Sequence, residues 1–136
     1  MNTAGRMKAL TLAGRIILEN GGETYRAEDT VYRMAQTMGL KEPDAFGVPS
    51  GLFISFTDET GERRTSVCRM HGRDTDLSRV DAVNQLSRRL TAGEISEEQL
   101  LEELTSLTKP ASLSRWHAPL TAALTEAGAN PQALPL

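Results

Sequence analysis

Hydrophobic residues recur with a helical period at both ends of the chain and with a period of two in the middle. Residues 7–20 carry a broad apolar face that predicts a helix, which the glycine pair after Asn20 ends. A second helix is predicted from about Thr24, with Gly39 as its C-cap, because its apolar residues fall at i, i+4, i+7, i+8 and i+11. These positions are Ala27, Val31, Met34, Ala35 and Met38.

The middle of the chain predicts a β-hairpin. Residues 52–57 alternate between apolar and polar side chains, so that Leu52, Ile54 and Phe56 share one face. A turn at residues 58–61 leads into a second predicted strand, Arg63–Met70. The prolines and glycines between residues 43 and 51 leave room for at most a short strand at Ala45–Val48.

The last third of the chain predicts two further helices. The first follows Asp76 as its N-cap and ends at Gly93, with an inward stripe of Leu77, Val80, Val83, Leu86 and Leu90. The second begins with a capping box, Ser96-Glu97-Glu98-Gln99, and stops at Lys109-Pro110. A short helix could follow around Leu120–Leu124, and the tail is expected to fray.

This order of elements predicts an α+β domain with two N-terminal helices, a small antiparallel hairpin-based sheet and two or more C-terminal helices. The length of 136 residues fits one domain. A net charge of −3 argues against nucleic-acid binding, which depends on clustered positive charge. No apolar run approaches a membrane span and no secretory signal is evident, so the chain is expected to be soluble.

Candidate chemistry is densest between residues 19 and 30. The candidate substrate-binding residues are Glu19, Glu23, Thr24, Tyr25, Arg26 and Glu28. Arg26 could grip a carboxylate, and Glu19 or Glu23 could bind an ammonium group beside the exposed N–H groups of a helix start. Under the alternative interpretation the segment only caps a helix, with Thr24 as the N-cap and Arg26 paired with an acid.

Three segments, in order along the chain, resemble the threonine/serine exporter family. They are LAGRIILENGGETYRAEDTVYRMAQTMGL, VPSGLFISF and RTSVCRMHGRDTDLSRVDAVNQLSRRLTAGEIS, and the likeness extends over about Leu12–Leu107. The resemblance implies a bacterial transporter of small amino acids such as threonine or serine. It also implies that residues 1–110 are an N-terminal cytosolic domain at the inner membrane, and that the first membrane helix of the family would begin within residues 111–136.

Several roles remain open for such a domain. It could act as a gate, a substrate sensor or a docking module for a membrane-spanning domain or subunit, and a weak homodimer is expected from its unpaired strand edges. Alternatively, it could be a small hydrolase-like enzyme acting on the exported substrate, or a purely structural oligomerisation module. The residues predict no cofactor and no metal site, because Cys68 and His71 lack the spacing of metal ligands. A cleft between the first two helices with Glu23 and Arg26 free of ion pairs would favour a ligand.

Overall fold

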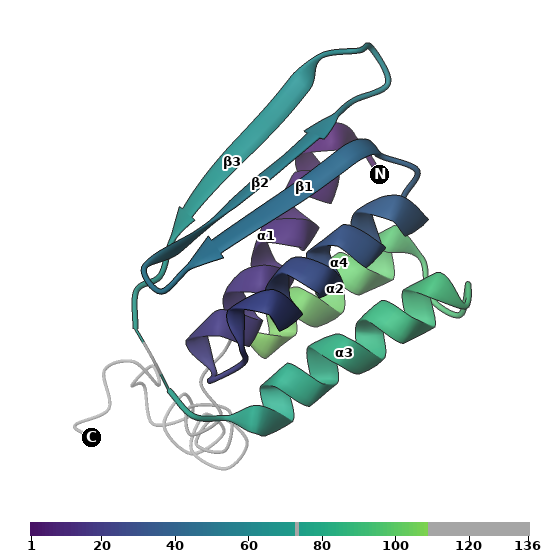
Figure 1. Ribbon diagram of the computed structural model, residues 1–136. Helices are drawn as coiled ribbons and strands as arrows, with labels where there is room; N and C mark the ends of the chain where they lie inside the picture. The colour runs from purple at the N-terminus through teal and green to yellow at the C-terminus, as the bar shows by residue number, and fades with distance from the viewer. Residues whose placement is uncertain (73, 109–136) are drawn as a thin grey trace, which may run out of the picture. The chain divides into compact units, whose positions relative to one another are not determined.

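The computed structural model describes residues 1–72 and 74–108, and it confirms the α+β class (Figure 1). The elements in chain order are α1 (Thr3–Glu19), α2 (Thr24–Thr37), β1 (Lys41–Val48), β2 (Gly51–Thr57), β3 (Arg63–Arg69), α3 (Leu77–Thr91) and α4 (Glu97–Leu107). Helix α1 begins earlier than predicted, because the side chain of Asn2 accepts a hydrogen bond from the Gly5 N–H group at 2.8 Å and caps it. The predictions for residues 109–136 lie outside the described residues.

The sheet is antiparallel with strand order β1-β2-β3, and α1 and α2 pack against one of its faces (Figure 1). The predicted apolar face of the central strand is confirmed, because Leu52, Ile54 and Phe56 are all at most 2% exposed. Helix α1 approaches this strand closely at Gly14, where an added Cβ would lie 2.3 Å from Leu52 Cδ2. A side chain at residue 14 would therefore push the helix away from the sheet.

The prediction of a short first strand was wrong, because β1 begins at Lys41 and continues through Pro43 to Val48. The register with β2 shifts between Lys41 and Asp44, and Glu42 adopts a positive φ of 49° there. Strand β1 lies at the edge of the sheet. A proline is tolerated at such an irregularity on an edge strand, since its missing N–H group removes no essential ladder bond.

Helix α3 packs against α2 and α1 and runs parallel to α2. Two hydrogen-bonded pairs fix this alignment, Thr30 with Asn84 at 3.4 Å and Thr37 with Thr91 at 3.2 Å. Most of the predicted inward stripe is buried, but Leu77 is 61% exposed and does not belong to it. Leu77 lies in the first turn of α3 next to Gly21, and a glycine has no side chain that could cover it.

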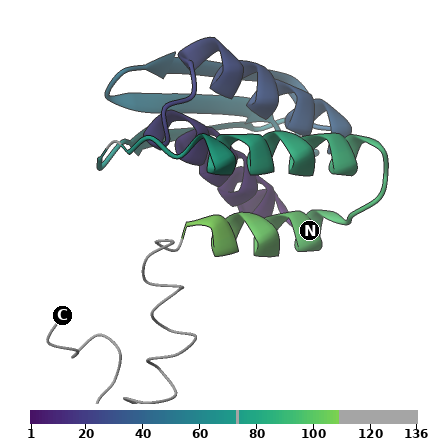
Figure 2. The same cartoon turned by 90° about the horizontal axis from the view of Figure 1, so that it is seen from below.

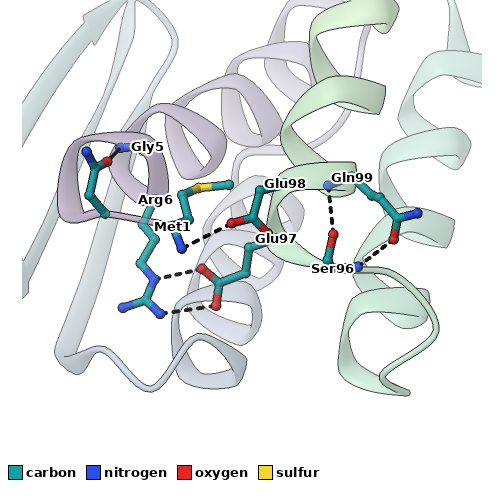
Figure 3. A network of polar contacts seen from close by, with 8 residues as sticks. Met1, Gly5, Arg6, Ser96, Glu97, Glu98 and Gln99 are labelled. Atoms are coloured by element: carbon teal, nitrogen blue, oxygen red, sulfur yellow. Dashed lines mark hydrogen bonds and ion pairs between the residues drawn. The ribbon is translucent and has the colours of Figure 1, made fainter.

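Polar contacts attach α4 to the start of α1, beside which it lies (Figures 2 and 3). The Arg6 guanidinium donates two hydrogen bonds to the Glu97 carboxylate, from Nε at 2.7 Å and from Nη2 at 3.2 Å. The N-terminal ammonium group lies 3.2 Å from Glu98 Oε2. Three and seven residues after Glu97, Leu100 and Leu104 are fully buried. Helix α4 is therefore held by both apolar burial and charged hydrogen bonds.

The predicted helix ends differ in how they are capped. The capping box of α4 is confirmed, with reciprocal bonds of 2.8 Å and 3.1 Å between Ser96 and Gln99 (Figure 3). Asp76 occupies the predicted N-cap position of α3, but its side chain makes no capping bond to the backbone. Its carboxylate instead accepts the hydroxyl hydrogen of Ser78.

A buried carboxylate organises the turn between β2 and β3. Asp58 Oδ1 accepts hydrogen bonds from the N–H and hydroxyl groups of Thr60 and from the Glu62 N–H group, at 2.6–3.0 Å. Asp58 Oδ2 accepts from Arg64 Nε at 2.9 Å. The hydrogen bonds from Thr60 and Arg64 hold the pKa of Asp58 well below its usual range.

Asp58→Asn is expected to lower the melting temperature at neutral pH by several degrees. Because the pKa is lowered in the folded state, the ionised carboxylate stabilises the fold above its unfolded pKa of about 4, and this contribution disappears as the pH falls. The difference in melting temperature between wild type and variant should thus shrink towards pH 2–3. Thermal denaturation over a pH series measures it, with Glu59→Gln in the same exposed turn as the control; a difference that does not change with pH would contradict the prediction.

Candidate functional site

Two glycines, Gly21 and Gly22, form the tight turn between α1 and α2. Gly21 follows the C-cap Asn20 with a positive φ of 93°, and the Gly22 N–H group donates to the Ile17 carbonyl at 2.8 Å. This is the six-to-one bond of a Schellman motif, and glycine adopts its left-handed conformation without steric cost. The turn leaves an open space in front of the first turn of α2.

A pocket of about 420 Å³ occupies this space. Its lining comes from the glycine turn, the start of α2 and the first turns of α3, namely Gly21, Gly22, Glu23, Arg26, Leu77, Val80, Asp81 and Asn84. The pocket therefore lies between α2 and α3, and not between the first two helices. Since α2 and α3 are parallel, the N-terminal ends of both helices lie at the end of the groove that holds this pocket.

The charged side chains of this pocket are not paired with one another. Arg26 is exposed and makes no ion pair within the described part of the chain. Glu23 Oε1 accepts a hydrogen bond from the Tyr25 hydroxyl at 3.1 Å, and Asp81 Oδ2 accepts one from Gln85 Nε2 at 3.1 Å. One guanidinium and two carboxylates thus line the same pocket with their charges uncompensated.

The capping interpretation of this segment fails in two respects. The N-cap of α2 is Glu23 rather than Thr24, and it makes no side-chain capping bond. Arg26 has no acidic partner among the residues that the structure describes. Glu23 and Arg26 thus form no ion pairs within the described part of the chain, which favours a ligand over a capping role.

The other candidate residues lie outside the pocket lining. Glu19 Oε2 is 3.2 Å from Arg15 Nε and accepts the His71 N–H group at 3.1 Å, so its carboxylate joins α1 to the segment after β3. Glu28 Oε2 accepts the Gly47 N–H group at 2.7 Å and joins α2 to β1. These two carboxylates hold elements of the fold together.

Sequence reasoning missed Asp81 and Asn84. They lie three positions apart on α3, so they share one helix face, but more than fifty residues separate them from the glycine turn. Their polarity on an amphipathic helix is indistinguishable from that of an ordinary solvated face. Only the parallel packing of α3 on α2 brings them to Arg26.

The described residues outside this pocket support neither a nucleophilic cysteine nor a metal site. Burial raises the pKa of the Cys68 thiol, which disfavours the thiolate needed for a nucleophile. Within residues 1–72 and 74–108, no group of three or more His, Cys, Asp or Glu side chains could hold a metal ion. No helix in the same ranges is long and apolar enough to cross a bilayer.

Fold and pocket together define a small α+β domain with a charged pocket between two parallel helices. A family model described as "Putative threonine/serine exporter" matches residues 8–131. Because this match covers most of the chain, the protein belongs to the threonine/serine exporter family. No curated protein and no solved structure matches the chain.

Proposed function

We propose that the chain is the cytosolic, substrate-sensing domain of a threonine/serine exporter and that it binds the small amino acid in the pocket beside Gly21 and Gly22. The single observation that carries the proposal is the unpaired Arg26 guanidinium facing the same pocket as Glu23 and Asp81. A free amino acid carries a carboxylate and an ammonium group, so it needs partners of both signs close together. This pocket offers both.

Each group of the ligand has a partner of suitable chemistry. The Arg26 guanidinium can hold the α-carboxylate with two parallel hydrogen bonds, and the N-terminal ends of α2 and α3 favour the same negative charge. Glu23 and Asp81 accept hydrogen bonds from the ammonium group. The Asn84 side chain offers both a donor and an acceptor to a side-chain hydroxyl, as threonine and serine would require.

The transport path belongs to a partner in this proposal. Residues 1–110 form the sensing domain, and residues 111–136 mark where the first membrane helix of the family would begin. The partner is therefore a membrane-spanning domain or subunit, which responds when the sensing domain binds an amino acid. The exposed edges of β1 and β3 leave room for a weak homodimer in addition.

Binding of threonine to the 136-residue chain tests the proposal by calorimetry. Arg26→Gln and Asp81→Asn are each expected to weaken binding at least about tenfold, since each removes a charged hydrogen bond worth roughly 1.5–3 kcal/mol. Arg89→Gln is the matched control, because Arg89 lies on α3 outside the pocket and faces Glu94 at 3.9 Å. Melting temperatures should stay within about 2 °C of wild type, since these are surface positions.

Two results would overturn the proposal. One is the absence of saturable heat with threonine and serine. The other is an equal loss of affinity in Arg26→Gln and Arg89→Gln, which would indicate a general effect of charge rather than this pocket.

A further inference from the structure

A second pocket of about 420 Å³ follows the first along the groove between α2 and α3. Three arginines line it, Arg26 and Arg33 from α2 and Arg88 from α3. Polar side chains fill the rest of the lining, namely Tyr25, Asp29, Thr30, Asn84 and Ser87. The groove continues past Arg33 and Arg88 into a further hollow of about 330 Å³.

Positive charge in this second pocket is poorly compensated. Among the lining residues that the structure describes, the only carboxylate is Asp29, which lies 3.0 Å from Arg33 Nε in an i,i+4 pair. Arg26 and Arg88 form no ion pair within the described residues. Two uncompensated guanidinium groups thus converge on one hollow of a chain whose net charge is −3.

Ser87 supplies an independent observation. Its side chain lines this pocket although the residue is only 7% exposed. Its hydroxyl makes no hydrogen bond to any residue in 1–72 or 74–108. The hydroxyl therefore has no partner to give up among these residues and can donate to an oxygen of a ligand in the pocket.

We propose that this pocket binds a soluble, phosphate-bearing small molecule. A phosphate group carries more than one negative charge and at least three acceptor oxygens, so it matches two free guanidinium groups and one hydroxyl donor better than a carboxylate does. Arg26 and Arg88 hold the phosphate oxygens from opposite helices, and the Ser87 hydroxyl donates to a third. The site adjoins the proposed amino-acid pocket, and Arg26 and Asn84 line both.

Pyrophosphate is the probe, titrated into the 136-residue chain at about 0.15 M salt to screen non-specific attraction. We expect saturable binding with one site per chain. Arg88→Gln should weaken it at least about tenfold, and Ser87→Ala should weaken it severalfold without any change of charge. Arg89→Gln, one residue along the same helix, should stay within about twofold of wild type because its side chain is outside the pocket.

Asp81→Asn separates this inference from the proposed function. Asp81 lines only the first pocket, so this variant should lose threonine affinity and keep its affinity for pyrophosphate. Arg88→Gln should show the reverse. Circular dichroism checks that each variant folds. If Arg88→Gln does not fold, Ser87→Ala still tests whether this pocket binds pyrophosphate.

Three outcomes would overturn the proposal. The first is the absence of saturable pyrophosphate binding. The second is equal weakening in Arg88→Gln and Arg89→Gln with no effect of Ser87→Ala, which indicates diffuse attraction. The third is flotation with phosphatidic acid vesicles that excess pyrophosphate does not reverse, which assigns the arginines to a lipid headgroup.

Discussion

Phe56→Ala is expected to destabilise the domain by about 3–5 kcal/mol. Phe56 is fully buried on the sheet face that α1 and α2 cover, and it is the largest fully buried side chain among the described residues. Removing the ring loses its transfer free energy and leaves a cavity that the surrounding helices cannot fill completely. Since a domain has only about 5–15 kcal/mol of stability, the variant should be partly or largely unfolded at 37 °C.

Phe53→Ala is the matched control on the same strand. Phe53 points to the opposite face of the sheet, is 42% exposed and packs against Phe46 with a centroid distance of 6.2 Å. Its loss should therefore cost no more than about 1.5 kcal/mol. Urea denaturation followed by circular dichroism measures both variants, and similar midpoints would refute the assignment of the sheet's inner face.

Arg26→Ala is expected to reduce amino-acid efflux at least about tenfold in a full-length exporter of the same family, at the position that corresponds to Arg26. Among the described residues that line the proposed amino-acid pocket, Arg26 is the only cation, and removing its guanidinium leaves the ligand carboxylate without its charged partner. Efflux of preloaded threonine from cells measures the effect. The isolated domain should keep its melting temperature within about 2 °C, because the residue is exposed.

Arg89→Ala provides the comparison in the same transporter. Arg89 lies on α3, is exposed and lines neither of the two pockets, so efflux should be nearly unchanged. Exporter abundance must be measured for each variant. If efflux falls only in proportion to abundance, or if Arg26→Ala lowers the melting temperature by many degrees, Arg26 has a structural role instead.

The hydrophobic pattern predicted the helices and the hairpin well, because each depends on interactions within a few residues. The glycine after α2 and the capping box of α4 are local signals of this kind, and both predictions are confirmed. Strand β1 was underestimated because Pro43 disfavours a strand in isolation. Its pairing with β2 decided the outcome, and that pairing connects residues distant in the chain.

For the candidate site as well, the sequence predicted local features and the tertiary structure decided the long-range contacts. The sequence by itself determined that residues 19–30 concentrate charge around a glycine turn, and two of those residues, Glu23 and Arg26, do line a pocket. The sequence could not determine which of the carboxylates already have hydrogen-bond or ion-pair partners in the fold. Glu28 is bound by a strand N–H group and Glu19 by Arg15 and His71, and these contacts exist only once the chain has folded.

Tertiary structure alone decided what stands opposite Arg26. The amphipathic pattern of α3 specifies which of its faces is buried, but it does not specify which helix will be its neighbour or in which direction it will run. The parallel packing of α3 on α2 places Asp81 and Asn84 across the groove from Arg26, and Ser87 and Arg88 one turn further on. Local sequence thus set the charge on each helix, and the packing of the two helices set which charges share a pocket.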